Sequence, residues 1–381
     1  MRTSHRTIRK LIREEQSKIT DEQLFSSQQF SAYMTDIVET ATKRYRRRSK
    51  VKMHWDPFSN SDVAHTDNRL IHINAANFLT RSFPTRSLQA DSIIGLAGHE
   101  AGHILFTDFT MLQIHMQALE AGSFYPAEPG NLTMLQSLSL QQIKNYFEEK
   151  DEAVIQAIRL VTHSLVNTME DLYIEARMMD AFPGSFKTGI LLNNLRFSED
   201  IPSVTDEIAE GHHEVFIIIN LLIQYAKSGD LNNADGYKGK YLDTLYECIP
   251  FLDDAAYDED AKARYQAANQ MLVLLWPYMP SLIEQVREDL KNKTHHAAQA
   301  AEEQLATPPK TLSGTSKPVP SKTPYNHTPS SEDEERERLQ SALDYETGRI
   351  ALEKTDEISE GDSGGTSVSY THLTLPTILL V

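Results

Sequence analysis

The sequence predicts an α+β protein that is mainly α-helical, with one small sheet and a long polar segment after the folded part. Three observations support this fold class. Apolar residues recur at helical spacing through most of the chain up to about residue 290, a short region after Val51 alternates apolar and polar residues, and the composition shifts sharply after about residue 295. With 381 residues and 40% hydrophobic content, the chain can bury a substantial core.

The N-terminal segment, residues 1–49, is predicted to form two helices. The second has apolar residues at roughly helical spacing, namely Leu24, Phe30, Met34, Ile37, Val38 and Ala41. From Val51 onward, the stretches VKMHW and RLIHIN alternate apolar and polar residues, and the turn-forming stretches SNSD and TDN separate them. We therefore expect two short strands, with a hairpin as the natural arrangement.

Asp91 is a candidate N-cap for the next helix, SIIGLAGHEAGHILFTDF, which is apolar enough to be buried. Further helices are expected over residues 135–150, 151–181, 205–227 and 260–290. Pro277 and Pro280 should interrupt the last of these, because proline breaks or kinks a helix. Residues 50–293 are accordingly assigned to one mainly helical domain.

The composition predicts three different segments after this domain. Six of the sixteen prolines fall between Pro308 and Pro329, so residues 294–331 are expected to form a disordered Pro/Ser-rich linker. Residues 332–367 are expected to form a short charged helix followed by an acidic remnant. The stretch VSYTHLTLPT matches the translation of a transposon-type sequencing adapter, so we interpret residues 368–381 as an adapter-derived artefact. We expect the natural sequence to end near Ser367 and a C-terminal domain to be missing.

The net charge of −17 argues against a general attraction to nucleic acid or to an anionic membrane. The basic run from Lys43 to Lys52 is a local exception, and we interpret it as a solvated helix end in preference to a nucleic-acid contact. Cys248 is the single cysteine, so the chain has no internal disulfide and no cysteine-built metal site. With no secretion signal and no apolar stretch long enough to span a bilayer, a soluble, cytoplasmic protein is expected.

The motif HEAGH predicts a zinc site. Residues four apart lie on one face of a helix, so His99 and His103 can present two imidazoles to one metal ion. Glu100 lies between them and is the expected general base, since a carboxylate beside bound zinc can take the proton of the attacking water. The structural alternative is a pair of core histidines bonded to neighbouring acids.

A third ligand must come from elsewhere, because Phe106 and Phe109 occupy the positions of Gly and His in the extended motif HExxHxxGxxH. The stretch NTMEDLYIEARMMD has carboxylates in an otherwise apolar helix, where a buried acid needs a cation or a histidine partner. We expect Glu170 to be the ligand. Asp171 and Glu175 are expected to orient the histidines, and either is an alternative ligand.

Other interpretations of these residues remain open. The acidic helix could instead be an ordinary amphipathic face whose acids pair with Arg177 or Arg159. Rival ligands are His163, on the same helix, and His115, just beyond the motif helix. His212 and His213 beside Glu214 resemble a ligand set, but adjacent helical residues point in different directions. The strand Leu70–Asn74 either aligns a peptide substrate by edge pairing or only packs beneath the motif helix.

These elements, in this order, carry a family resemblance. The pattern T-D-x-x-x-I-x-I-N from Thr66 to Asn74, then HEAGHILFTDF, then NTMEDLYIE, resembles the predicted metallopeptidase region that precedes a von Willebrand factor A (VWA) domain. Proteins with this region are commonly labelled cobalt chelatase CobT-like or nitric oxide reductase activation proteins. The resemblance covers about residues 50–180 and implies a zincin-like metallopeptidase fold in a bacterial or mobile-element setting.

The same resemblance implies a C-terminal VWA domain with a DxSxS metal-adhesion motif and a partner ATPase of the AAA+ type. No DxSxS occurs in this chain, where Asp362-Ser363-Gly364-Gly365 is only a short acidic, Gly-rich remnant. Three functions are therefore compared. The favoured one is a zinc peptidase acting on a peptide or protein substrate, the second is a non-catalytic metal-binding adaptor of a VWA/AAA+ system, and the third is nucleic-acid binding through Lys43–Lys52.

Overall fold

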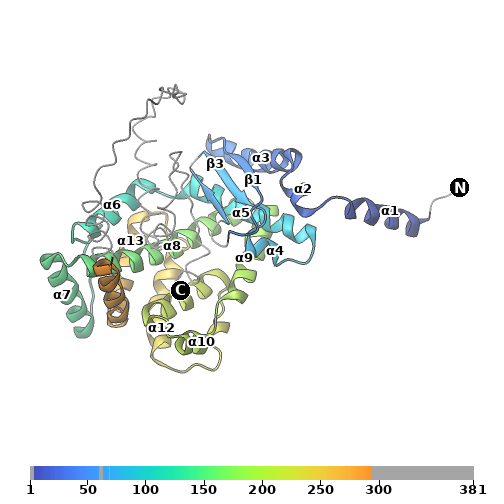
Figure 1. The fold of residues 1–381 in the computed structure, drawn as a ribbon. Helices are drawn as coiled ribbons and strands as arrows, with labels where there is room; N and C mark the ends of the chain where they lie inside the picture. Colours follow the sequence, from blue (N-terminus) through green and yellow to red (C-terminus); the bar gives the residue numbers. More distant parts are fainter. Residues whose placement is uncertain (1–3, 60–62, 68, 293–381) are drawn as a thin grey trace, which may run out of the picture.

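The computed structural model describes residues 4–59, 63–67 and 69–292. In this part of the chain the fold is mainly helical with one three-stranded sheet, as the sequence predicts (Figure 1). The predicted linker (294–331), the charged helix and acidic remnant (332–367) and the adapter-derived tail (368–381) lie outside the described residues. No helix in the described ranges is long and apolar enough to cross a membrane.

Thirteen labelled α-helices and three short 3-10 helices make up the described fold. In chain order they are α1 (His5–Ser17), α2 (Asp21–Phe25), α3 (Gln28–Thr42), η1 (Lys43–Tyr45), α4 (Phe78–Arg81), α5 (Arg86–Phe106), α6 (Phe109–Glu120), α7 (Met134–Glu149), α8 (Glu152–Ala181), α9 (Ser185–Asp200), α10 (Val204–Glu210), α11 (Glu214–Ser228), η2 (Asn232–Ala234), α12 (Lys240–Ala255), α13 (Ala261–Leu275) and η3 (Trp276–Tyr278). A further helical segment covers 280–292, so Pro277 and Pro280 do interrupt the last predicted helix.

The N-terminal helices differ from the prediction in number. The predicted second helix is divided into α2 and α3, because Ser27 caps the start of α3 by accepting the amide hydrogen of Phe30. Phe25, Met34 and Val38 belong to the same hydrophobic core as α5 and α8, so this segment packs with the domain that follows it. Helix α1 stands away from the body of the molecule (Figure 1).

The sheet contains one strand that the sequence analysis did not predict, and its pairing corrects the expected hairpin. The strands are β1 (Lys50–His54), β2 (Ala64–Thr66) and β3 (Leu70–Asn74), in the order β1-β3-β2. Strand β1 runs parallel to β3, whereas β2 and β3 are antiparallel. The turn after β2 is closed by Asp67, whose carboxylate accepts the amide hydrogens of Arg69 and Leu70.

The two edges of this sheet have different surroundings. Thr35 on α3 accepts the Val51 amide hydrogen at 3.0 Å and, like Ser31, donates to the Val51 carbonyl, so α3 covers the edge of β1. Strand β3 is central and already paired on both sides. The hypothesis that Leu70–Asn74 aligns a substrate by edge pairing is therefore wrong, and β2 is the strand at the other edge.

Helix α5 begins earlier than expected. The hydroxyl of Thr85 accepts the amide hydrogen of Leu88, and Asp91, the predicted N-cap, lies within the helix. Leu88, Gln89 and Ala90 favour helix, so the helix continues upstream of the apolar stretch that suggested a start at Asp91. The helix ends at Phe106, and Asp108 caps the separate helix α6.

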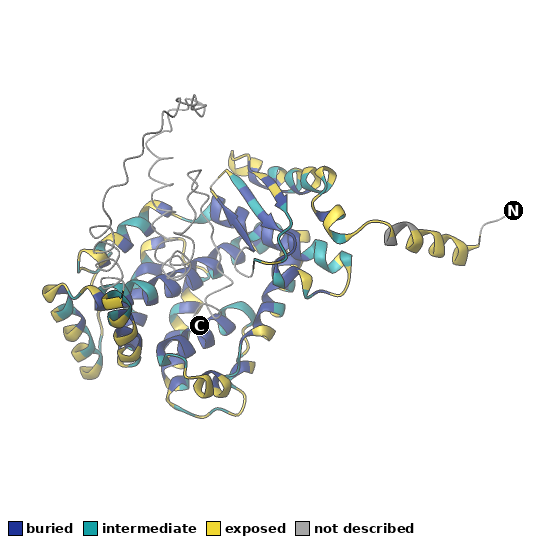
Figure 2. Cartoon of the chain, viewed as in Figure 1, coloured by how far each residue is buried: buried dark blue, intermediate teal, exposed yellow. Residues whose placement is uncertain are grey.

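Helices α5 and α8 form the centre of the fold. Both are dark blue in Figure 2 over much of their length, whereas α1 is exposed. Helix α5 packs against β2 and β3 on one side and against α8 and α9 on another, and α8 also contacts α6, α11 and α13. Helices α4, α6, α9 and α12 were not predicted, and the helix predicted over 205–227 is divided into α10 and α11. For α9 the reason is its sequence, SFKTGILLNNLRFSED, which mixes polar and apolar residues without a clear apolar face.

Candidate metal centre

Three glycines let α5 approach its neighbours closely. A Cβ added to Gly95 would lie 2.3 Å from the backbone of Gly189 on α9, and one added to Gly102 would lie 3.0 Å from Met178 on α8. Gly98 similarly faces Phe186, at the start of α9. These close approaches place the HEAGH turn of α5 directly against the acidic turn of α8.

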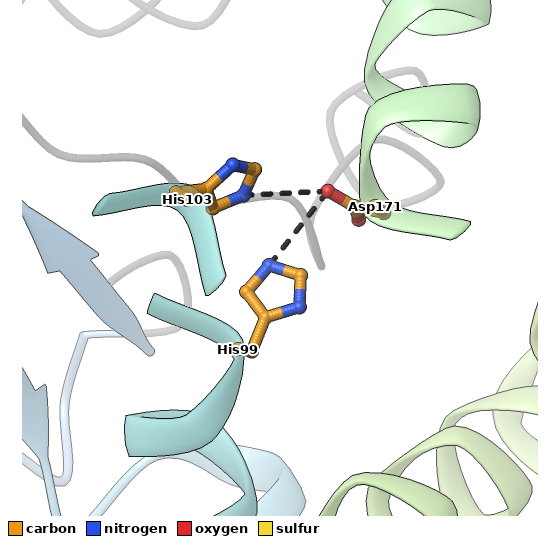
Figure 3. A group of neighbouring side chains, drawn as sticks. All are labelled: His99, His103 and Asp171. Atoms are coloured by element: carbon orange, nitrogen blue, oxygen red, sulfur yellow. Dashed lines mark ion pairs between the residues drawn. The ribbon is translucent and has the colours of Figure 1, made fainter. Parts of the chain in front are cut away.

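His99, His103 and Asp171 converge at this contact (Figure 3). The two imidazoles come from successive turns of α5, and their ring centres are 4.9 Å apart. Oδ1 of Asp171, on α8, lies 3.7 Å from Nε2 of His99 and 3.5 Å from Nε2 of His103. The three side chains are 13%, 2% and 5% exposed in the order His99, His103, Asp171, so the group is largely shielded from water.

The far nitrogen of each imidazole is held by another side chain. Nδ1 of His99 lies 2.9 Å from Oε1 of Glu175, and the amide of Asn194 donates to the other carboxylate oxygen of Glu175 at 2.6 Å. An ionised carboxylate can only accept, so Nδ1 of His99 carries a proton, and Nε2, which faces Asp171, is the nitrogen that can bind a metal once it is deprotonated. Glu175 therefore orients a histidine, which is the role the sequence analysis gave it.

The second imidazole is held through a hydroxyl. Nδ1 of His103 lies 3.0 Å from Oγ1 of Thr107, one helical turn further along. When Nδ1 carries the proton, it donates to the hydroxyl oxygen of Thr107. Nε2 of His103 is then the nitrogen available to a metal, as it is for His99.

The expectation that Glu170 is the third ligand is corrected by this arrangement. Oε1 of Glu170 accepts a 2.8 Å hydrogen bond from Nε of Arg264, on α13, and that guanidinium stacks 4.0 Å above the ring of Tyr173. Glu170 and Asp171 are adjacent on α8 and so point in different directions. Asp171, and not Glu170, is the carboxylate that lies with both imidazoles.

Lys227, in the last turn of α11, completes the polar surroundings. Its ammonium group lies 2.7 Å from Oε1 of Glu175 and 3.2 Å from Oδ2 of Asp171, and its side chain is only 8% exposed. Burial alone would lower the pKa of Lys227, but the two carboxylates outweigh it and raise that pKa. Burial alone would raise the pKa of Glu175, but the interactions with Lys227 and His99 outweigh it, so the net shift of that pKa is downward.

Glu100 follows His99 on α5. It is 2% exposed, and its Oε2 atom has no hydrogen-bond partner among the described residues. Burial raises the pKa of Glu100 to about 8, opposed by His99 and reinforced by Asp171. A buried carboxylate without a partner is costly, so its surroundings favour a nearby positive charge.

The two histidines titrate in opposite directions. Burial lowers the pKa of His99, but the charges of Asp171 and Glu175 outweigh it, so the net shift is upward. For His103 burial dominates and the pKa falls. A divalent cation binds the neutral imidazole, so binding at His99 is expected to release a proton.

The rival candidates lie outside this group. His115 is buried and its Nδ1 lies 2.8 Å from the carbonyl of Tyr125. His163 is buried on α8, but it is not part of the metal-ligand cluster. His212 lies 3.5 Å from Glu207, and His213 lies 3.0 Å from Ser281. Arg177 and Arg159, proposed as partners of the acidic turn, pair instead with Glu259 and Glu120.

The donor set fits zinc. Two imidazole nitrogens and one carboxylate oxygen are ligands that Zn²⁺ prefers, and three protein ligands leave a fourth position open. With zinc–ligand bonds of about 2.0–2.2 Å, the ligand atoms of a tetrahedral site lie roughly 3.3–3.6 Å apart. The two oxygen–nitrogen distances of 3.5 and 3.7 Å are close to this spacing, and the three ligand atoms all lie within 4.8 Å of one another.

Four residues that position the site were not identified from sequence: Thr107, Asn194, Lys227 and Arg264. Thr107 had a usable signal, since it follows His103 by one helical turn on the same face. The other three come from helices far along the chain. Their spacing relative to HEAGH carries no information, because only the packing of α9, α11 and α13 brings them to α5 and α8.

No family model, curated protein or solved structure matches this chain. The interpretation of function therefore depends on the chemistry of the site.

Proposed function

We propose that this protein is a zinc-dependent metallopeptidase with His99, His103 and Asp171 as metal ligands and Glu100 as general base. The observation that carries the proposal is the convergence of Asp171 on the two HEAGH imidazoles, with distances close to those of a tetrahedral site. Glu175 and Thr107 hold the far nitrogens, which leaves both Nε2 atoms directed at one point.

The chemistry follows from the open fourth position. Zn²⁺ held by His99, His103 and Asp171 would polarise a substrate carbonyl group and lower the pKa of a water molecule in the fourth position. Glu100 would take the proton of the attacking water and pass it to the leaving amine, since its carboxylate is buried and its Oε2 atom has no hydrogen-bond partner among the described residues. Three protein ligands favour a catalytic site over a structural one, since structural zinc sites usually have four.

A peptide is the proposed substrate class. Strand β2 is at one edge of the sheet and contacts α5, so a peptide backbone paired with β2 would run near the helix that carries the two histidines. We place the protein in the cytoplasm with a zincin-like fold, on the strength of the single cysteine and the resemblance of residues 50–180 to VWA-associated metallopeptidase regions.

The test combines metal content with cleavage. Elemental analysis of the purified protein should give one zinc per chain, and a library of unfolded peptides should be cleaved. Glu100→Gln should keep the zinc and lose cleavage by at least about 100-fold, since general-base catalysis contributes roughly 10²–10⁴-fold. Stoichiometric zinc without cleavage of any peptide would refute the peptidase while leaving the metal centre intact.

The burial of the ligands favours a second candidate. His103 and Asp171 are 2% and 5% exposed, which also suits a metal that stabilises the protein and does no chemistry. In that case the protein is a non-catalytic adaptor of an AAA+ ATPase, engaged through a VWA domain beyond this sequence. Capture of the ATPase by the longer protein, unchanged by His99→Ala, would favour the adaptor.

A further inference from the structure

Lys227 is the feature of the site that metal binding alone does not explain. A divalent cation is attracted by carboxylates and repelled by an ammonium group, yet Lys227 places its ammonium 3.2 Å from Oδ2 of the proposed ligand Asp171. The side chain is 8% exposed and α11 is apolar over most of its length, so Lys227 brings a positive charge into a largely buried, apolar surface.

The contacts of Lys227 divide the two oxygens of Asp171 between two partners. Oδ1 faces the Nε2 atoms of His99 and His103, whereas Oδ2 accepts from Lys227. An oxygen that accepts from a buried ammonium is a poor metal ligand, because binding the metal would require giving up a charge-assisted hydrogen bond. Asp171 can therefore reach a metal through one oxygen only.

The same ammonium ties Asp171 to Glu175. These carboxylates are one turn apart on α8 and repel each other, and Lys227 bonds to both, at 3.2 and 2.7 Å. Oε1 of Glu175 also lies 2.9 Å from Nδ1 of His99, so Lys227 fixes one ligand directly and a second through Glu175.

We propose that Lys227 is a positioning residue that restricts Asp171 to one-oxygen coordination and thereby makes the site selective for four-coordinate metals such as Zn²⁺ and Co²⁺. The inference rests on the metal site proposed above. Ions that prefer six or more oxygen-rich ligands, such as Mn²⁺ and Ca²⁺, gain from a carboxylate that binds through both oxygens. Lys227 occupies the second oxygen of Asp171, so these ions cannot bind it, whereas a tetrahedral ion does not need it.

A geometric role for Lys227 is distinguished from a general repulsion of cations by the selectivity between metals, and not by the affinity for one metal. Removing a positive charge beside the site strengthens the binding of every divalent cation to a similar degree. That common effect cancels in the ratio of two dissociation constants. The ratio of the dissociation constants for Mn²⁺ and Zn²⁺ therefore reports the coordination geometry that Lys227 imposes.

The test uses the wild-type chain, Lys227→Met, Lys227→Gln and the control Lys144→Met, each stripped of metal and titrated with Co²⁺, Zn²⁺ and Mn²⁺. Lys144 also pairs with a carboxylate, Glu128, but its side chain is 38% exposed and lies on α7. Wild type and Lys144→Met should show the intense visible absorption of four-coordinate Co²⁺. In Lys227→Met this absorption should weaken as Asp171 adds its second oxygen, and the preference for Zn²⁺ over Mn²⁺ should fall by about tenfold or more.

Lys227→Gln retains a hydrogen-bond donor without the charge, so an intermediate result is expected. An unchanged Co²⁺ spectrum and an unchanged Mn²⁺/Zn²⁺ ratio in Lys227→Met would overturn the proposal for Lys227 and leave the metal centre standing. If neither variant folds, X-ray absorption at the zinc edge of the wild type decides, because a two-oxygen Asp171 there also overturns it. A wild-type chain that binds neither Co²⁺ nor Zn²⁺ would refute the metal centre and this inference together.

Discussion

Glu170 and Arg264 form an ion pair in which both side chains are almost completely buried, with 2.8 Å between Nε and Oε1 and exposures of 3% and 1%. Removing one partner leaves a buried charge uncompensated, so Arg264→Met should lower the free energy of unfolding by about 3–5 kcal/mol. The double variant Glu170→Gln/Arg264→Met should recover much of this loss, because neither charge remains. Urea denaturation of the three proteins measures the effect, and a double variant as unstable as Arg264→Met would contradict it.

This pair also explains which part of the site the sequence could predict. His99, Glu100 and His103 are fixed by local helix geometry, so their motif identifies them without knowledge of the fold. That an acidic turn near residue 170 meets them follows from the cost of burying carboxylates. The choice between Glu170 and Asp171 depends on a rotation of about 100° around α8, and it is decided by Arg264, which arrives from a distant helix.

The sheet shows the same limit. The alternation in Lys50–His54 and Leu70–Asn74 predicted both strands, but β2 has only three residues and all three are buried, so no alternation marks it. Without β2 the two visible strands suggest a hairpin. In the structure β2 pairs antiparallel with one edge of β3, and β1 pairs parallel with the other edge.

Asp171→Asn should abolish high-affinity zinc binding, with Glu170→Gln as the matched control. The amide is a weaker zinc ligand than the carboxylate, and loss of an orienting partner alone already costs about 10–100-fold in affinity, so loss of a ligand should cost at least about 100-fold. Glu170→Gln should cost less, because Glu170 bonds to Arg264 and lies outside the group formed by His99, His103 and Asp171. Competition with a chromophoric chelator measures both, and a larger loss in Glu170→Gln would reverse the ligand assignment.

Gly95→Ala should destabilise the protein although alanine favours helix by about 1 kcal/mol over glycine. The added Cβ would lie 2.3 Å from backbone atoms of Gly189, and backbone cannot give way as a side chain can. We expect a net loss of about 1–3 kcal/mol and weaker zinc binding, since α9 also carries Asn194, which holds Glu175. Gly130→Ala is the control, because no atom lies within 4 Å of its added Cβ; thermal unfolding of equal stability in both variants would exclude the steric explanation.

His115 should make the protein less stable in acid. Burial lowers the pKa of His115 to about 4, whereas in the unfolded chain it returns to near 6.5, so between these values the unfolded chain binds a proton that the folded chain does not. The contribution of neutral His115 to the free energy of unfolding is fully present above pH 6.5 and falls by up to about 3 kcal/mol as the pH drops to 4. His115→Phe should remove this slope, and the carbonyl of Tyr125 keeps a donor in Asn269. Denaturant unfolding at several pH values tests it, and parallel pH profiles for the two proteins would contradict it.

Thr107→Val should weaken zinc binding by about 10–100-fold without a large loss of stability, because valine keeps the shape of threonine and removes only the hydroxyl. That hydroxyl lies 3.0 Å from Nδ1 of His103, so its loss frees the imidazole to rotate and to adopt the tautomer with a protonated Nε2, which cannot bind a metal through that nitrogen. Thr107→Ser retains the hydroxyl and should bind zinc as the wild type does. Zinc competition titrations on the three proteins separate the two substitutions; equal affinities for the valine and serine variants would mean that His103 is held by the packing of α5 alone.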